Sequence, residues 1–430
     1  MSKNNQPQEK TKVLFFGDSP SVATGFATVS RNILTGLYNT GRYNIEVLGV
    51  NYWGQKHSFP WWQHIVGLND QKDPYGRQKV FSMIPSMEFD ILFFLQDTFI
   101  LDFLPDLHKV LRSKDKKFRS VCYFPTDGVP KEQWLKNVDA CDYTVSYSNF
   151  GKTESMKAFP GMKEPLFIPH GANTSDFFPI SKEEREAFRR QYFGPVANKF
   201  IFTNVNRNQQ RKDIPRTIAA FKEFRKQVPD SVLYLHMAKK DQGWDLPEVV
   251  QAYGLSISKD VIFPENFGPN QGYPLQVLNL IYNASDCILS TTLGEGMGLG
   301  WIEGMATKTP IIMPANTAPQ EFITPDTGWL CKSGGNPSLY TTVPNDNEVT
   351  RPLVDVEDLV SVMLEIYNNP LEAKRRAENA YTWVKTKMEW QNSIVPQWVK
   401  LFDRLSKEVK NNEVVIPQPT ENKVITSEEF

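Results

Sequence analysis

Two series of short apolar runs, each separated by polar loops and amphipathic segments, most constrain how this chain folds. The first series consists of KVLFFGD, IEVLGV, DILFFLQD, RSVCYFPTD and DYTVSYS. The second consists of KFIFTNV, SVLYLHM, DVIFPE, DCILSTT and TPIIMPA. Continuous apolar runs that alternate with helical segments are typical of parallel sheets covered on both faces by helices. The sequence therefore predicts an α/β protein with two doubly wound domains in tandem.

The length of 430 residues also favours two domains. We place the hinge near residues 172–195, where Pro179, Gly194 and Pro195 interrupt the alternation. Asp355 is expected to cap a helix over about 356–369. The predicted parts are an amino-terminal Rossmann-like domain at residues 11–178 and a carboxy-terminal Rossmann-like domain at 179–386. A helix at 387–410 is expected to pack back on the body through Trp390, Trp398 and Phe402, and a flexible tail is expected at 411–430.

Composition excludes some functional classes. The formal net charge is −1 and both halves are close to neutral, which argues against a general attraction to nucleic acid or anionic lipid. The four cysteines show no metal-ligand spacing and are expected to be buried free thiols in a reducing compartment. The sequence shows neither a signal peptide nor a long apolar stretch, so we expect a cytoplasmic protein without a transmembrane segment.

The segment GEGMGLGWIEGMA follows the predicted strand DCILSTT and places Glu295 and Glu303 around a run of glycines. On one helix the two acids would lie roughly 12 Å apart, too far to share one proton or one metal ion. Glycines leave backbone amides accessible, and ionised carboxylates accept hydrogen bonds from hydroxyl groups. We therefore expect the two acids to contact separate points of an elongated, hydroxyl-bearing ligand.

A second loop, in FTNVNRNQQRKDIPRTIAAF, joins a strand ending near Val205 to a helix beginning near Asp213. Arg207 and Lys212 flank the loop, and a helix amino terminus attracts phosphate. An arginine and a lysine together can neutralise a diphosphate. This neutralisation matters most when the diphosphate is a leaving group that gains negative charge. The alternative is a solvated basic loop. Phosphates beside the cations and hydroxyls beside the acids describe a nucleotide sugar.

These motifs resemble those of the retaining glycosyltransferases of family 4. The resemblance covers roughly residues 12–405 and is strongest over 200–325. It implies the GT-B architecture, in which two Rossmann-like domains face each other across a deep interdomain cleft. By that resemblance, Glu295 would contact the donor sugar and Glu303 the ribose, Arg207 and Lys212 would form the Arg-x4-Lys diphosphate pair, and backbone amides near the ligand would come from Met297, Gly298 and Leu299.

The amino-terminal half offers two further candidates. Gly25 in GDSPSVATGFATV resembles the loop glycine that lets the backbone approach the diphosphate, and an ordinary turn before a helix is the alternative. Asp127 in YFPTDGVP stands where many family members have a histidine, and an Asx turn before Gly128 is the alternative. The aromatic segment containing Trp53, Trp61 and Trp62 either stacks on an acceptor or packs internally, and packing is favoured.

The resemblance implies transfer of a hexose, with retention, from a UDP- or GDP-linked donor to an acceptor hydroxyl. It assigns catalytic roles to Arg207, Lys212, Glu295 and Asp127, and no metal or other cofactor is expected. The acceptor stays open among glycan, lipid, small molecule, protein and modified DNA base, and charge does not favour nucleic acid. The alternative is a non-catalytic nucleotide-sugar-binding or scaffold protein. A dinucleotide-dependent oxidoreductase is disfavoured because Glu295 would face the pyrophosphate.

Overall fold

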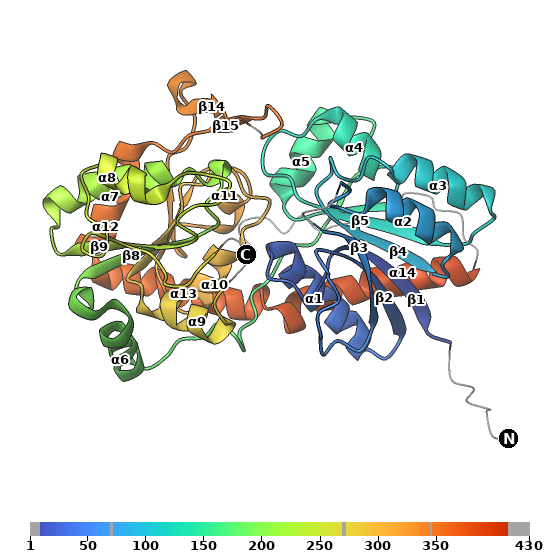
Figure 1. The fold of residues 1–430 in the computed structure, drawn as a ribbon, viewed down its shortest axis with the longest axis horizontal. Helices are drawn as coiled ribbons and strands as arrows, with labels where there is room; N and C mark the ends of the chain where they lie inside the picture. The colour runs from blue at the N-terminus through green and yellow to red at the C-terminus, as the bar shows by residue number, and fades with distance from the viewer. Residues whose placement is uncertain (1–8, 69–71, 269–271, 345, 412–430) are drawn as a thin grey trace. The chain divides into compact units, whose positions relative to one another are not determined.

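The computed structural model describes residues 9–68, 72–268, 272–344 and 346–411, which form two compact units (Figure 1). The amino-terminal unit contains the described residues up to Thr126, Pro130–His170 and those from Trp390 onward. The carboxy-terminal unit contains Asp127–Val129 and Gly171–Glu389. The main division therefore lies at residue 171 rather than at the predicted 179.

The amino-terminal unit is built on a seven-stranded parallel sheet in the order β3-β2-β1-β4-β5-β6-β7. Its central strands are almost entirely buried, as expected for a sheet with helices on both faces. The strands are β1 (Thr11–Asp18), β2 (Tyr43–Val50), β3 (Trp62–Gly67), β4 (Ile91–Leu95), β5 (Arg119–Phe124), β6 (Tyr143–Ser146) and β7 (Leu166–Phe167). The helices are α1 (Gly25–Asn39), α2 (Arg77–Met83), α3 (Leu104–Ser113), α4 (Glu132–Val138) and α5 (Asn149–Ala158).

The carboxy-terminal unit repeats this plan with a six-stranded parallel sheet in the order β10-β9-β8-β11-β12-β13. Its strands are β8 (Phe200–Val205), β9 (Ser231–His236), β10 (Val261–Ile262), β11 (Cys287–Leu289), β12 (Ile311–Pro314) and β13 (Trp329–Cys331). Its helices are α6 (Lys182–Phe193), α7 (Ile214–Gln227), α8 (Leu246–Ala252), α9 (Leu275–Ala284), α10 (Leu299–Ala306), α11 (Pro319–Phe322), α12 (Val356–Asn368) and α13 (Pro370–Lys387). A separate antiparallel hairpin consists of β14 (Tyr340–Thr342) and β15 (Thr350–Pro352).

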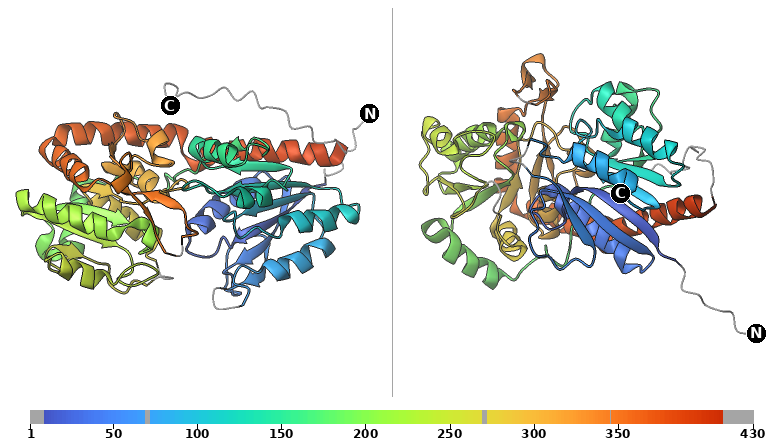
Figure 2. Two further views of the ribbon diagram at one scale, coloured as in Figure 1. Left: turned by 90° about the horizontal axis from the view of Figure 1, so that it is seen from above. Right: turned by 45° about the vertical axis from the view of Figure 1, so that its right-hand side comes forward.

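The last helix of the described residues is α14 (Val395–Asn411), which belongs to the amino-terminal unit and lies along it in Figure 2. The residues after Asn411, where the flexible tail is predicted, lie outside the described residues. Trp398 and Phe402 are fully buried and contact the ring of Phe93 on β4. A Cβ added at Gly36 of α1 would collide with the side chain of Val395, so the two helices pack closely. The predicted apolar stripe therefore packs against the amino-terminal sheet.

Several local predictions are confirmed by the structure. The Asp355 side chain accepts hydrogen bonds from the amides of Glu357 and Asp358 at the start of α12, as expected for a cap. All four cysteines are free and buried. No helix in the described part of the chain is long and apolar enough to span a membrane.

The tryptophans of the aromatic segment differ in burial, so neither of the two expected roles describes all of them. Trp61 is buried and stacks on Phe59 with ring centroids 5.0 Å apart, as the packing interpretation requires. Trp53 and Trp62 instead remain 67% and 70% exposed. Internal packing therefore accounts for only part of this segment.

Candidate functional site

The candidate site lies where β8 and β11, neighbouring strands of the carboxy-terminal sheet, end and lead into their loops. Open α/β sheets bind ligands at the carboxyl ends of their strands. Asn206, just after β8, donates a hydrogen bond to Ser290, just after β11, over 3.2 Å. The amide of Leu293 also donates to the carbonyl of Arg211. The two loops that carry the sequence motifs are thus bonded to each other.

The loop after β8 closes with a short 3-10 turn, Gln210–Lys212, before α7 begins at Ile214. Asp213 between them has a φ of +43°, a left-handed conformation that reverses the chain into the helix. Upstream, the buried Asn208 side chain bonds to the carbonyl of Trp244 and accepts from its amide, which anchors the loop after β9. The turn directs Lys212 into the interior, where only 11% of its side chain is exposed.

The loop after β11 contains the glycines and ends at Gly298, where the backbone φ is +83° and α10 begins at the next residue. No side chain caps this helix amino terminus, so the first amides of α10 have no capping side chain as a partner. The Met297 side chain is buried, and its carbonyl accepts a hydrogen bond from the Trp301 indole over 2.7 Å. Of the three predicted amide donors, Gly298 and Leu299 therefore lie at the helix start.

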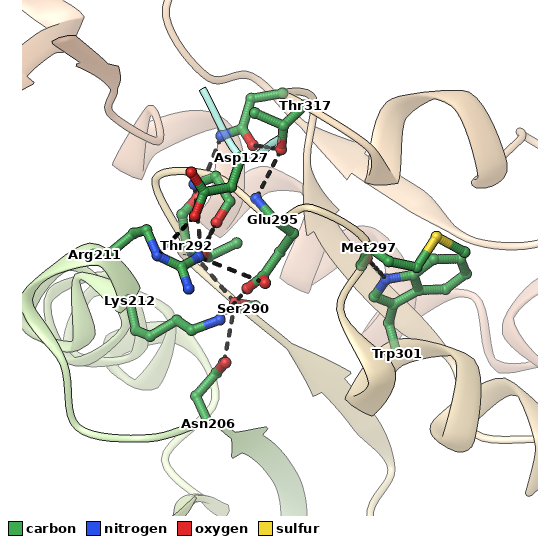
Figure 3. A network of polar contacts seen from close by, with 12 residues as sticks. Asp127, Asn206, Arg211, Lys212, Ser290, Thr292, Glu295, Met297, Trp301 and Thr317 are labelled. Atoms are coloured by element: carbon green, nitrogen blue, oxygen red, sulfur yellow. Dashed lines mark hydrogen bonds and ion pairs between the residues drawn. The ribbon is translucent and has the colours of Figure 1, made fainter. Parts of the chain in front are cut away.

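Four charged side chains meet at this point, as Figure 3 shows. Lys212 forms an ion pair with Glu295. Arg211 lies between two carboxylates, with its Nε 3.2 Å from Asp127 and its Nη1 3.6 Å from Glu295. The backbone amide of Glu295 donates to Thr317 over 2.9 Å, which attaches a third loop. The structure thus brings together Lys212, Glu295 and Asp127, three of the predicted residues.

Burial and neighbouring charges have opposite effects on the pKa values of the residues in this cluster. Burial raises the pKa of Glu295 and of Asp127, but adjacent cations outweigh it, so both pKa values lie below the usual range. Glu295 owes this to Lys212 and Arg211, and Asp127 to Arg211 and Arg351. Burial lowers the pKa of Lys212 to about 8, although Glu295 opposes the shift. Both carboxylates are ionised at neutral pH and can accept hydrogen bonds.

Glu303 lies on α10 in a different environment. One of its carboxylate oxygens accepts a hydrogen bond from the Tyr282 hydroxyl over 2.8 Å. Burial raises its pKa to about 7, the Tyr282 bond opposes this, and nearby Asp176 adds to it. The acid therefore changes charge near neutral pH. Glu295 and Glu303 thus have different partners within the protein, Lys212 and Tyr282.

Arg207 is not part of the cluster. Its guanidinium forms a bidentate pair with Asp241 at 3.0 to 3.1 Å, and about half of its side chain, 48%, is exposed. The turn at Gln210–Lys212 separates the two predicted diphosphate ligands, because Lys212 faces inward while Arg207 bonds to the loop after β9. The Arg-x4-Lys spacing therefore does not place the two cations in contact in this structure.

Gly25 is the first residue of α1 in the amino-terminal unit. The preceding residue, Thr24, caps the helix by accepting from the amide of Ala27, and its hydroxyl donates to the buried carboxylate of Asp18. Burial raises the pKa of Asp18. Gly25 thus follows the loop after β1 at an ordered helix start, which fits both the turn and the ligand-loop interpretations.

Two arginines of the site were not predicted. Arg211 precedes Lys212 directly and bonds to the carbonyl of Gly294 as well as to the acids. Arg351, on β15, binds both the carbonyl and the carboxylate of Asp127. The sequence does offer a sign of Arg211, because this residue stands directly beside Lys212 in the same turn. Arg351 lies in a segment without any motif.

Residues 185–341 match the family described as "Glycosyl transferases group 1". The matched residues all lie within the carboxy-terminal unit. The matched residues include the loop after β8, the loop after β11 and α10, which together carry Lys212, Glu295 and Glu303.

Curated relatives of this chain are distant. The putative glycosyltransferase EpsD of Bacillus subtilis is 26% identical over 210 residues, which cover 48% of this chain and 51% of EpsD. The alpha-1,3/1,6-mannosyltransferase ALG2 of Yarrowia lipolytica is 24% identical over 244 residues, covering 50% and 49%. The chain therefore spans about half the length of these relatives.

Solved structures with a similar fold cover nearly the whole chain. Sucrose-phosphate synthase from Thermosynechococcus elongatus has a TM-score of 0.70 at 18% identity and covers 92% of this chain and 99% of its own. HepE from Anabaena, solved in complex with UDP-glucose, has a TM-score of 0.67 at 16% identity and covers 92% and 100%. These similarities confirm the predicted GT-B fold.

Proposed function

We propose that this protein is a retaining glycosyltransferase that moves a hexose from a nucleoside-diphosphate sugar to an acceptor hydroxyl. The observation that carries the proposal is the Lys212–Glu295 ion pair at the end of the carboxy-terminal sheet, inside the matched group 1 region. A cation for the diphosphate and a carboxylate for sugar hydroxyls lie side by side there. HepE, which has a similar fold and was solved with UDP-glucose, supports a donor of this class.

In this proposal each residue has one role in donor binding. Lys212 neutralises the diphosphate, together with the amides at the start of α10. Glu295 accepts hydrogen bonds from the sugar hydroxyls, and Glu303 in its ionised form accepts from the ribose diol. Arg207 exchanges Asp241 for the diphosphate when donor binds. These roles assign the charge of the diphosphate to protein groups, so no metal is assigned.

The reaction proposed is a same-face transfer. The bond between the anomeric carbon and the diphosphate oxygen breaks while a bond to the acceptor oxygen forms. The proton of the acceptor hydroxyl goes to the departing diphosphate, which leaves as a nucleoside diphosphate. The contribution of the protein is positioning and stabilisation of the leaving-group charge. Asp127 and Arg211, beside Glu295, set the electrostatic environment of the sugar.

Thermal unfolding against a panel of UDP-, GDP-, ADP- and TDP-hexoses tests donor binding. A ligand that binds only the folded protein stabilises it by about 2.7 kcal/mol at a concentration of 100 times Kd, and this stabilisation raises the melting temperature. We expect a UDP- or GDP-hexose to stabilise the protein and Glu303→Ala to lose most of that shift. Glu183→Gln, an exposed acid on α6, is the control. An unchanged shift in Glu303→Ala would remove Glu303 from the site.

Donor hydrolysis separates an enzyme from a non-catalytic binder. Slow release of nucleoside diphosphate without acceptor supports transfer chemistry, whereas saturable binding without release identifies a nucleotide-sugar-binding protein. NMR of the first-formed sugar tests retention, since an α-linked donor must yield the α-anomer before mutarotation. A β-anomer as first product would contradict the same-face mechanism.

A further inference from the structure

The hairpin of β14 and β15 contributes a buried arginine to the candidate site. The hairpin is antiparallel and lies outside the six-stranded parallel sheet, as Figure 1 shows. Tyr340 and Thr342 of β14 are exposed, yet the Arg351 side chain on β15 is only 4% exposed. A charged side chain is rarely buried without a specific partner. The contacts of Arg351 therefore indicate what the hairpin does.

Arg351 is held between two aspartates. Its Nε and Nη2 bind the two carboxylate oxygens of Asp346 at 2.6 and 2.9 Å, within the hairpin. Its Nη1 donates to Asp127 at both the carbonyl and, over 2.9 Å, the carboxylate Oδ1. Asp346 thus fixes the guanidinium plane, and the remaining nitrogen fixes Asp127. Planar bidentate pairing of this kind is specific to arginine.

Asp127 in turn contacts Arg211, in the loop after β8. Its other carboxylate oxygen lies 3.2 Å from the Nε of Arg211, whose Nη1 approaches Glu295 at 3.6 Å. A row of alternating charges therefore runs from the hairpin through Asp127 and Arg211 to the Glu295–Lys212 pair. Because Arg211 is divided between two carboxylates, neither holds it alone.

The backbone around Asp127 is pressed against the same loop. A Cβ added at Gly294 would collide with the Asp127 carbonyl oxygen, so no other residue fits there without movement. A Cβ at Gly128 would lie 2.8 Å from Arg351 Nη1. The two glycines and Arg351 thus leave Asp127 little freedom to move.

We propose that Arg351 is a positioning residue for the sugar subsite. It holds Asp127 on Arg211, so that the Arg211 guanidinium does not close onto Glu295 as a bidentate pair. The Glu295 carboxylate then keeps hydrogen-bonding capacity for the hydroxyls of the donor sugar. This inference rests on the proposed function, and it predicts that Arg351 affects recognition of the sugar and not of the nucleotide.

The test compares affinities for a nucleoside diphosphate and for its hexose by titration calorimetry. The probes are UDP with UDP-glucose and GDP with GDP-mannose. In Arg351→Gln we expect the hexose to bind roughly tenfold more weakly, the loss of about one charge-assisted hydrogen bond, while UDP or GDP alone stays within about twofold. Arg376→Gln is the matched control, since Arg376 is also largely buried and ion-paired in the same unit.

Further variants separate positioning from folding. Arg351→Lys keeps the charge but not the bidentate geometry, so we expect it to bind the hexose with intermediate affinity and to stay folded. Asp127→Asn should lower hexose affinity as Arg351→Gln does. The double variant should be no weaker than either single one, because both act through the same contact.

The outcomes of these experiments distinguish a failure of the inference about Arg351 from a failure of the proposed function. Wild-type protein that binds neither nucleotide nor nucleotide sugar overturns the proposed function and this inference with it. Wild-type binding with unchanged hexose affinity in Arg351→Gln and Arg351→Lys overturns the inference alone. Equal losses for UDP and UDP-glucose indicate a purely structural role and also overturn it, as do additive effects of the Arg351 and Asp127 substitutions.

Discussion

Ionisation of Glu303 should make the stability of the protein depend on pH. Its pKa in the folded protein is about 7 and its ordinary pKa is 4.5, so the folded protein holds this proton more tightly than the unfolded chain. The resulting stabilisation is complete below pH 4.5 and is lost as the pH rises through 7. Each pKa unit corresponds to about 1.4 kcal/mol, so the change between pH 5 and pH 8 amounts to about 2.5 kcal/mol.

Glu303→Gln removes this dependence because the amide is neutral at every pH while its oxygen still accepts from Tyr282. Relative to wild type, the variant should gain about 2.5 kcal/mol between pH 5 and pH 8, or roughly 5 to 10 °C in the melting temperature of a unit of this size. Thermal melts followed by near-ultraviolet circular dichroism measure the difference, with Glu183→Gln as control. A wild-type-to-variant difference that stays constant from pH 5 to pH 8 refutes the reasoning.

Three further predictions concern packing and charge. Lys212→Met should destabilise the carboxy-terminal unit by about 3 kcal/mol in denaturant melts, since it leaves Glu295 buried with only the more distant Arg211, and adding Glu295→Gln should restore part of the loss. Gly294→Ala should cost about 1 to 3 kcal/mol and weaken donor binding, whereas Gly268→Ala, where a Cβ meets nothing within 4 Å, should do neither in the same assays. Trp398→Ala should destabilise the amino-terminal unit by about 3 to 5 kcal/mol in thermal melts.

The parallel sheets could be predicted because their strands are short apolar runs, buried on both faces and separated by helices. Strands without this pattern were missed. β3 combines Trp62, which is exposed, with Gln63 and His64, so its sequence lacks the apolar run that indicates a strand of this sheet. β7 has only two residues and β14 reads YTT, which gives no periodicity to detect.

The candidate site was predictable to the extent that its chemistry is local in sequence. Glu295 and Lys212 come from loops that directly follow strands, so their position at the sheet edge could be expected. Arg351 could not be found in this way, because it binds an aspartate 224 residues earlier in the chain. The side-chain direction of Arg207 was equally hidden, since it depends on Asp241 in another loop.

In the proposed function, Arg211, which the Arg-x4-Lys motif does not include, allows the site to accommodate both an empty and a filled donor position. With no donor, Lys212 and Glu295 satisfy each other, and an ionised pair in the interior is costly only when one partner is removed. A diphosphate that binds Lys212 removes that partner from Glu295. Arg211, 3.6 Å from the same carboxylate, remains as its counter-charge, so Glu295 stays ionised and able to accept hydroxyl hydrogen bonds. In titration calorimetry, loss of Arg211 should therefore weaken binding of the nucleotide sugar more than loss of any other cation except Lys212.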